Sequence, residues 1–184
     1  MAEDGWIETV LDFWFEELGP KDWFSVSQEL DETIRKRFLT LHEEIASDVP
    51  DISRTEPNAA LAAIIVLDQF PRNMFRGTER AFATDPIACD LSRNAVAQGF
   101  DRGLTEQGRQ FLYMPMMHSE TLSDQDRSVE LFEALGNDNA LQYAREHHDI
   151  ISRFGRFPYR NEVLSRETTS EEETFLADAD TYGQ

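Results

Sequence analysis

The chain has little of several residue types, and each scarcity excludes a class of protein. A single cysteine, Cys89, among 184 residues excludes a disulfide framework and a cysteine-based zinc site. Nine glycines and seven prolines are too few for a collagen-like or low-complexity chain. The longest apolar run, residues 59–67, is too short to cross a bilayer. Residues 1–6 are acidic and lack the basic region of a signal peptide, so we expect a soluble cytoplasmic protein.

Basic charge is also scarce. There are 36 acidic and 17 basic residues, which gives a net charge of −19. A field of this sign repels nucleic acid phosphates and anionic lipids, so we expect neither nucleic acid nor a membrane as a partner. The acid gathers at the ends, because residues 1–60 carry −10 and residues 167–184 carry −6. The middle of the chain is nearly balanced and rich in arginine, which suits bidentate contacts with carboxylate or phosphate, although codon bias explains it equally well.

The apolar content is high enough for one packed core. Hydrophobic residues make up 40% of the chain, with 13 Phe and 3 Trp, and this excludes wholesale disorder. We expect a single helical domain over residues 1–166. Residues 167–184 form an acidic C-terminal segment, expected to be a short helix or a frayed tail.

Apolar residues recur at helical spacing along nearly the whole chain, and no stretch alternates as a strand does. Helices are expected at residues 6–18, 25–47, 57–70, 84–99, 105–113, 123–135 and 138–154, with a short last one capped by Ser170 and Glu173. Pro115 is expected to break the fifth. The short connections favour antiparallel neighbours. The sequence therefore predicts an all-α, single-domain antiparallel array of seven to eight helices, in which residues 59–70, apolar on every side, are the most buried.

Asp68 is the most unusual polar residue in this pattern. It lies in the last turn of the most apolar helix, where the helix dipole and burial both disfavour a carboxylate unless a cation neutralises it. Arg72 and Arg76 are the nearest cations, with Asn73 between them. A buried ion pair that pins the following loop and a ligand-facing site explain this segment equally well.

Two further segments combine charge with aromatic residues and proline. His118 and Glu120 follow a methionine-rich helix end, where a hydrogen-bonded structural histidine is the simpler interpretation and ligands for a metal are too few. His147 lies on an apolar helix face, as core histidines commonly do. Three arginines, Arg153, Arg156 and Arg160, and then Asn161 follow it within fourteen residues.

Several long motifs carry a resemblance to a known family. They are Leu67-Asp68-Gln69-Phe70-Pro71-Arg72-Asn73, Phe75-Arg76-Gly77, Ala81-Phe82-Ala83-Thr84-Asp85, Tyr113-Met114-Pro115, Met117-His118-Ser119-Glu120 and Arg153-Phe154-Gly155-Arg156-Phe157-Pro158-Tyr159-Arg160-Asn161. With these motifs, residues 10–164 resemble the bacterial domain-of-unknown-function family 924. The resemblance implies a fold similar to tetratricopeptide-like helical arrays and implies no biochemical role. Met116 stands where the family usually has Phe, and Tyr159 where it usually has His, which removes a third histidine from any metal site.

The favoured hypothesis is a pocket that binds a small anionic molecule. A Gly-rich phosphate loop, a His-Glu-x-x-His pair and a Gly-x-Ser-x-Gly elbow are all missing from the sequence, and no cofactor or metal is expected. The candidate binding residues are Asp68, Arg72, Asn73, Arg76, His118, Glu120, His147, Arg153, Arg156, Arg160 and Asn161. Because the two carboxylates are fewer than the five arginines, the pocket is expected to keep an excess of positive charge.

Two other hypotheses use the same residues differently. The first is a hydrolase-like enzyme in which His118 or His147 is the general base and Asp68 or Glu120 orients it. The second is a tetratricopeptide-like scaffold that holds a peptide, with the pocket residues only structural. The sequence does not distinguish oligomeric states.

Overall fold

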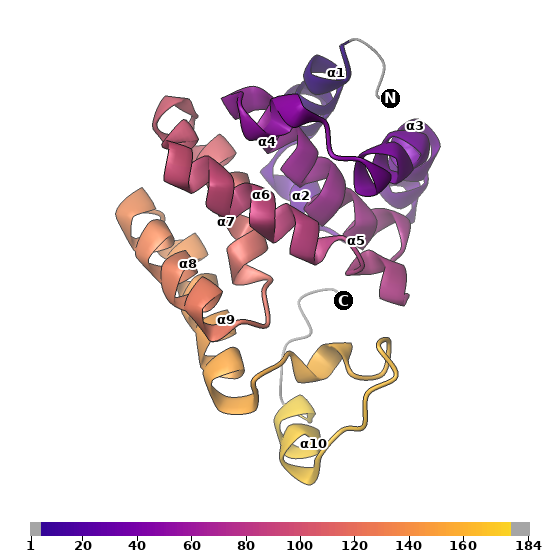
Figure 1. The fold of residues 1–184 in the computed structure, drawn as a ribbon. Coiled ribbons are helices and arrows are strands. Elements are labelled where there is room, and N and C mark those ends of the chain that lie inside the picture. The colour runs from indigo at the N-terminus through magenta and orange to yellow at the C-terminus, as the bar shows by residue number, and fades with distance from the viewer. Residues whose placement is uncertain (1–4, 178–184) are drawn as a thin grey trace.

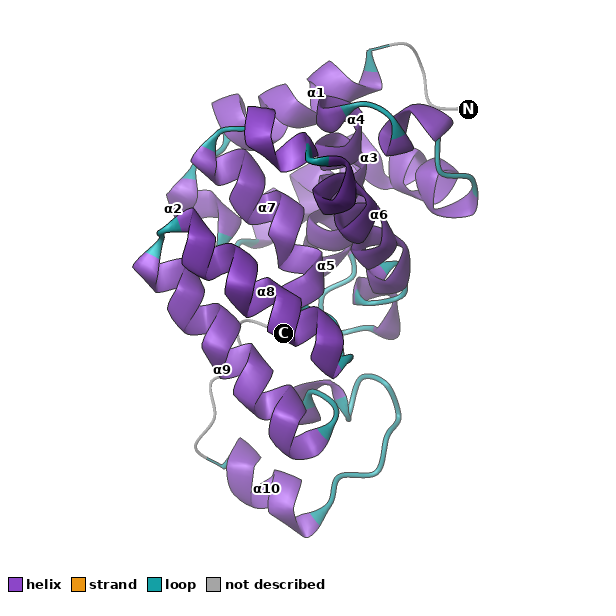
Figure 2. Ribbon diagram, turned by 60° about the vertical axis from the view of Figure 1, so that its left-hand side comes forward, coloured by secondary structure: helices purple, strands orange, loops and turns teal. Residues whose placement is uncertain are grey.

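The computed structural model describes residues 5–177, and every regular element in this range is helical (Figure 2). The all-α prediction is confirmed, while the tetratricopeptide-like arrangement remains an expectation. None of the described helices has the length and apolarity needed to span a membrane.

Most of the chain forms helices of seven residues or more. These are α1 (Trp6–Asp12), α3 (Gln28–Ser47), α4 (Pro57–Ile64), α6 (Asp85–Gln98), α7 (Glu106–Met117), α8 (Leu122–Leu135), α9 (Asp138–Phe154) and α10 (Ser170–Leu176). The shorter elements are α2 (Pro20–Trp23), α5 (Phe70–Met74), the 3-10 turns η2 (Asp51–Arg54), η4 (Glu79–Ala81), η5 (Phe100–Gly103) and η6 (Pro158–Arg160), and the π turns η1 (Phe13–Glu17) and η3 (Ile65–Gln69). Consecutive helices from α6 to α9 pack side by side (Figure 1).

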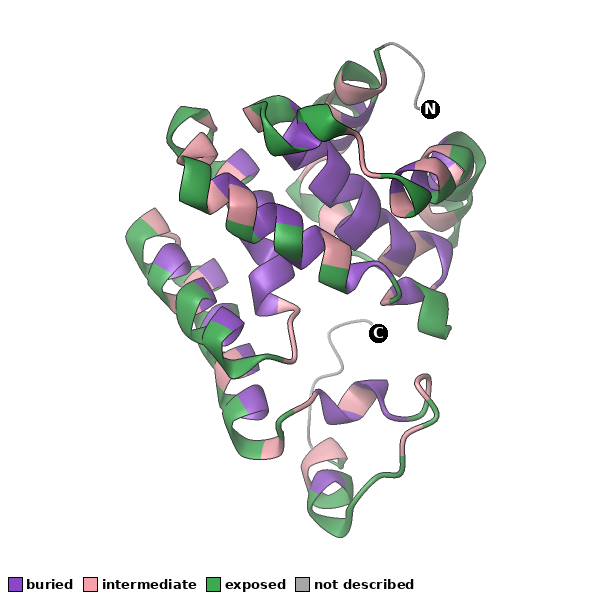
Figure 3. Cartoon of the chain, viewed as in Figure 1, coloured by how far each residue is buried: buried purple, intermediate pink, exposed green. Residues whose placement is uncertain are grey.

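The apolar helix expected at the centre of the fold is indeed the most buried part. Every residue from 59 to 71 is buried, and Ile64 and Leu67 are fully covered. The helix packs against α1, α6 and α7, which leave none of its sides to solvent (Figure 3). A helix without a polar face has no side suited to water, so the rest of the array surrounds it.

The π turn η3 continues α4 into α5, so the helix runs past Phe70, its expected end, as far as Met74. A π turn leaves backbone carbonyls to be satisfied by other groups. The Thr84 hydroxyl donates to the Leu67 carbonyl at 2.6 Å, and His42 Nδ1 donates to the Val66 carbonyl at 3.1 Å. These contacts fix the turn that carries Asp68.

The expectation that Pro115 breaks its helix is wrong, because α7 continues to Met117. Pro115 is buried between Met114 and Met116, and the packing of these side chains overrides the cost of the missing backbone donor.

The starts of two helices differ slightly from the sequence expectation. The helix expected from residue 25 begins at Gln28 as α3, and its cap is Ser27, whose hydroxyl accepts from the Leu30 amide. The capping box of α10 is formed by Thr169 and Glu172 rather than Ser170 and Glu173. Neighbouring serine and threonine residues are equally suitable as caps, and only the backbone geometry decides which one caps the helix.

A small apolar cluster, distinct from the main core, lies at the end of α9. Its buried residues are Ile150, Ile151 and Phe157, and Phe175 from α10 packs against them. α10 is the short helix expected in the acidic segment, while residues 178–184 lie outside the described residues. The division at residue 166 stays a prediction.

Leu67→Ala should destabilise the protein strongly. The substitution leaves a cavity in the core that the surrounding helices cannot fill. Such a change lowers the free energy of unfolding by about 2–5 kcal/mol. Urea unfolding followed by circular dichroism measures the loss. The matched control is Leu122→Ala, because Leu122 is 46% exposed. Equal effects of the two substitutions would contradict the central position of the helix.

Candidate functional site

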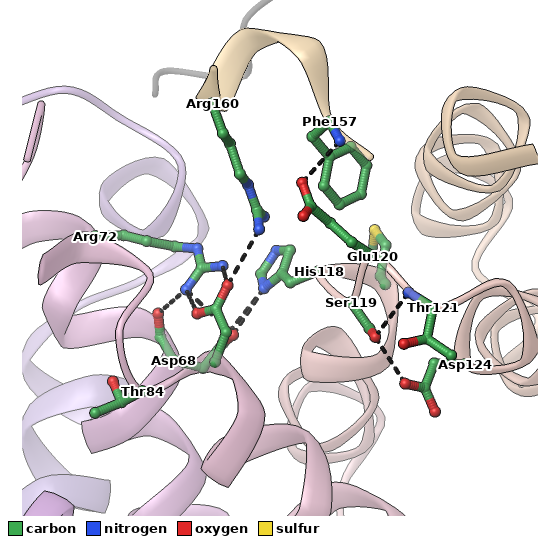
Figure 4. Close-up of polar contacts among 12 residues, drawn as sticks. Asp68, Arg72, Thr84, His118, Ser119, Glu120, Thr121, Asp124, Phe157 and Arg160 are labelled. Atoms are coloured by element: carbon green, nitrogen blue, oxygen red, sulfur yellow. Dashed lines mark hydrogen bonds and ion pairs between the residues drawn. The ribbon is translucent and has the colours of Figure 1, made fainter. Parts of the chain in front are cut away.

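Asp68 is the centre of a buried charge network (Figure 4). Its side chain is completely inaccessible to solvent. His118 Nδ1 lies 2.8 Å from Oδ1, the Arg72 guanidinium lies 3.2 Å from the same oxygen, and the Gln69 amide donates to Oδ2. The sequence-based expectation that Arg72 neutralises Asp68 therefore agrees with the geometry.

The network continues from Arg72 to a second carboxylate and a second arginine. Arg72 donates two hydrogen bonds to Asp85, at 2.8 and 2.9 Å, and Asp85 also accepts from Arg160 NH1 at 3.3 Å. A chain of contacts thus joins His118 through Asp68, Arg72 and Asp85 to Arg160. It connects the end of α7 with η3, α5, α6 and η6, and its two carboxylates balance its two guanidinium groups.

The inner pair, Asp68 and Arg72, is ionised on both sides. Burial alone raises the pKa of Asp68, but Arg72, His118 and Gln69 outweigh burial and hold the pKa of this carboxyl well below its usual range. Burial also opposes the charged form of Arg72, yet Asp68 and Asp85 raise the pKa of its guanidinium. Removing one partner of such a pair leaves an uncompensated buried charge, which costs about 3–5 kcal/mol.

The network fixes the protonation of His118. Because an ionised Asp68 only accepts hydrogen bonds, the His118 Nδ1 atom must carry the proton and donate it. Burial and the charge of Arg72 lower the pKa of His118 more than Asp68 raises it, so the ring is neutral near pH 7. Nε2 is then an unprotonated acceptor, and no described residue makes a hydrogen bond to it.

Arg160 is buried with only part of its hydrogen-bonding capacity used. Its guanidinium lies between the rings of Phe82 and Phe157, 4.5 and 4.6 Å from their centroids, and the side chain is only 5% exposed. The bond from NH1 to Asp85 is its single hydrogen bond to the described part of the chain, and Nε has no partner there. Burial lowers the pKa of Arg160.

His118 and Arg160 both line a cleft of about 560 Å³. Its apolar wall consists of Phe82, Ala83, Pro86 and Leu164. Its charged residues are Arg80, Arg93 and Arg160 on the basic side and Glu79, Asp85, Glu120 and Asp124 on the acidic side. The expected excess of positive charge is therefore not found over the cleft as a whole, because Asp85 and Asp124 enter it from the first turns of α6 and α8.

Asp124 organises the other end of the cleft, which sequence reasoning missed. It accepts from Arg93 at 2.9 Å and from the Ser119 hydroxyl at 2.7 Å, and the Cys89 thiol lies 3.5 Å away. Burial and Asp124 raise the pKa of Cys89 to about 12, so the thiol stays protonated at neutral pH and is a poor nucleophile. In the sequence, only the position of Ser119 next to His118 pointed to this group of residues around Asp124.

Glu120 borders the cleft but is held by the backbone and by an arginine that the sequence did not single out. It accepts from the Phe157 amide at 2.8 Å and from Arg166 at 2.8 and 3.0 Å. These donors lower its pKa in spite of burial. Glu120 therefore ties the turn after α7 to residues 157–166, which follow α9.

His147 lies behind His118 and is not part of the cleft lining. The two ring centroids are 6.4 Å apart, and His147 Nδ1 donates to the Tyr143 carbonyl at 2.9 Å. Burial, the largest cause, lowers the pKa of His147 to about 3, so this ring is neutral. A buried neutral ring with a backbone partner agrees with the interpretation of His147 as a core histidine.

Asp68 and Arg72 belong to the charge network but do not line the cleft, and five other candidate residues lie outside both. Asn73 and Arg76 both bind Asp31 of α3, at 2.8 and 3.0 Å. Arg153 pairs with Glu171, while Arg156 and Asn161 both donate to Glu172. The structure therefore brings together Asp68, Arg72, His118, Glu120 and Arg160. It does not bring Arg76, Arg153 or Arg156 to the same place. Among residues 5–177, no three His, Cys, Asp or Glu side chains are grouped as metal ligands.

The fold and the cleft define a small all-α protein in which a buried chain of ion pairs ends at the wall of the cleft. The chain belongs to a family of bacterial proteins of unknown function, DUF924, whose model matches residues 10–180. A protein of unknown function from Agrobacterium tumefaciens, ATU0120, has a similar solved structure, with a TM-score of 0.89 and 39% sequence identity. The match covers 94% of this chain and 97% of that one. No curated protein matches the chain significantly.

Stability should depend on the ionisation of Glu172. Hydrogen bonds from Arg156, the largest cause, lower its pKa from 4.5 to about 2. Since the folded protein prefers the ionised form, this stabilisation is present above about pH 4.5 and is lost as the pH falls toward about 2. Glu172→Gln should therefore lower the melting temperature at pH 7, and the gap to the unsubstituted protein should close in acid.

Thermal unfolding followed by circular dichroism between pH 2 and pH 7 measures this gap. The control is Glu171→Gln, because the Glu171 side chain is 63% exposed in its pair with Arg153 and should contribute little. A gap for Glu172→Gln that does not change with pH would show that the carboxylate charge is not what holds α10.

Proposed function

We propose that the cleft binds a small anionic molecule, with Arg160 as its anchor. The observation that carries this proposal is the state of Arg160, which is buried and makes a single hydrogen bond to the described part of the chain. Its one carboxylate partner, Asp85, is shared with Arg72, and Arg72 takes the shorter contacts of 2.8 and 2.9 Å. An anion at the remaining edge of Arg160 would supply the charge-assisted hydrogen bonds that the protein does not provide.

The size and lining of the cleft support a small molecule over a peptide. A volume of about 560 Å³ lies within the usual range for small-molecule sites, and apolar residues line one wall. A peptide-holding scaffold would need an extended groove, for which this compact hollow offers less support.

Arg160→Gln should weaken binding of small anions by about tenfold or more, because hydrogen bonds to charged groups contribute about 1.5–3 kcal/mol. The probes are inorganic phosphate and a panel of monocarboxylates and dicarboxylates, measured by isothermal titration calorimetry. The variant should fold, since Asp85 keeps both hydrogen bonds from Arg72.

The matched control is Arg153→Gln, which removes an arginine that is 52% exposed and bound to Glu171. This variant should bind the probes as the unsubstituted protein does. No binding of any probe by the unsubstituted protein, or equal binding by the Arg160 variant, would contradict the proposed site.

A second candidate function is a hydrolase-like enzyme with His118 as general base. The pair of Asp68 and His118 favours it, because a carboxylate bound to Nδ1 leaves Nε2 ready to accept a proton from water or a hydroxyl group. Asp68 would be a positioning residue. NMR spectra of the same titration samples, recorded over hours, distinguish the two functions, since an enzyme would convert its ligand whereas a binding protein would leave it unchanged.

A further inference from the structure

Two groups on the cleft wall keep unused hydrogen-bonding capacity, and they are of opposite kinds. Arg160 presents N–H groups, which only donate. His118 Nε2, with the proton held on Nδ1 by Asp68, only accepts. Both line the same cleft, and Figure 4 shows the Arg160 side chain extending from η6 toward His118.

A plain carboxylate does not complement this pair. Its oxygens suit Arg160, but each carries only lone pairs, so an oxygen placed beside Nε2 sets one acceptor against another. An anion that also carries a hydroxyl group satisfies both: the charged oxygens accept from Arg160, and the hydroxyl donates to Nε2. Sites built to bond a ligand hydroxyl discriminate strongly against analogues that lack it.

We infer that the ligand of the cleft is a hydroxy acid, a carboxylate with a hydroxyl group close to its charged end. This inference rests on the proposed binding of an anion at Arg160 and adds the chemistry that His118 selects. The carboxylate lies against Arg160, the hydroxyl bonds His118 Nε2, and Asp68 acts as the positioning residue that fixes the histidine tautomer.

The rest of the cleft indicates the body of the ligand. Phe82 and Leu164 contribute to an apolar wall, with Ala83 and Pro86 beside them. An apolar or aromatic group attached to the hydroxy acid would cover this wall and be withdrawn from water. The most informative probes are therefore matched pairs of anions that differ only in the hydroxyl group and that range in the size of their apolar part.

The experiment is a calorimetric titration with three such pairs: lactate and propionate, malate and succinate, and 3-phenyllactate and 3-phenylpropionate. Inorganic phosphate is included as an anion of another class. In each pair that binds, the hydroxylated member should bind about tenfold more tightly, as expected for one additional satisfied hydrogen bond. The aromatic pair should bind best.

The matched variant is His118→Asn. An asparagine amide donates to Asp68 as Nδ1 does, which keeps the buried carboxylate satisfied, but it places no acceptor at the position of Nε2. This variant should bind both members of each pair equally. His148→Asn is the control, because His148 is bound to Asp126 on the surface and does not line the cleft.

Each outcome decides between the two levels of the proposal. A hydroxyl preference that disappears in His118→Asn supports the inference. Equal binding within every pair, or binding of phosphate alone, overturns the hydroxy acid but leaves anion binding at Arg160 intact. No binding of any probe overturns the proposed function, and the inference fails with it.

Discussion

The structure depends on keeping one carboxylate charged in the middle of its core. Asp68 lies within the most buried helix of the protein and is inaccessible to solvent. An unpaired charge there would cost several kcal/mol, so Arg72 and His118 must face it and Asp85 must face Arg72 in turn. These contacts link the ends of α5, α6 and α7 and extend from the core to Arg160 at the wall of the cleft.

The sequence predicted the helices well because their signals are local. Apolar spacing, Gly155 at the end of α9, and the featureless apolar stretch of α4 each specify an element without reference to the rest of the chain. The misplaced break at Pro115 has a different origin. Its helix continues because of buried contacts that no local pattern reveals.

The site was predictable only where the partners are near in sequence. A carboxylate in an apolar helix needs a cation beside it, and Arg72, four residues after Asp68, could be predicted as that cation. The partners of the other arginines could not be predicted, because Asp31, Asp85 and Glu172 contact them from elements that are distant in sequence. Each of these acids lies in the first turn of a helix, where a carboxylate is favoured and attracts no notice in sequence. Of the five arginines expected from the sequence to line one pocket, only Arg160 therefore lines the cleft.

The central claim is that Asp68 holds His118 as a neutral ring with its proton on Nδ1. Nitrogen-15 NMR of the histidine side chains at pH 7 tests this directly, with the His118→Asn variant assigning the resonances. Two distinct ring nitrogens are predicted for His118, one protonated Nδ1 and one unprotonated Nε2. A doubly protonated ring, or a proton on Nε2, would contradict the account.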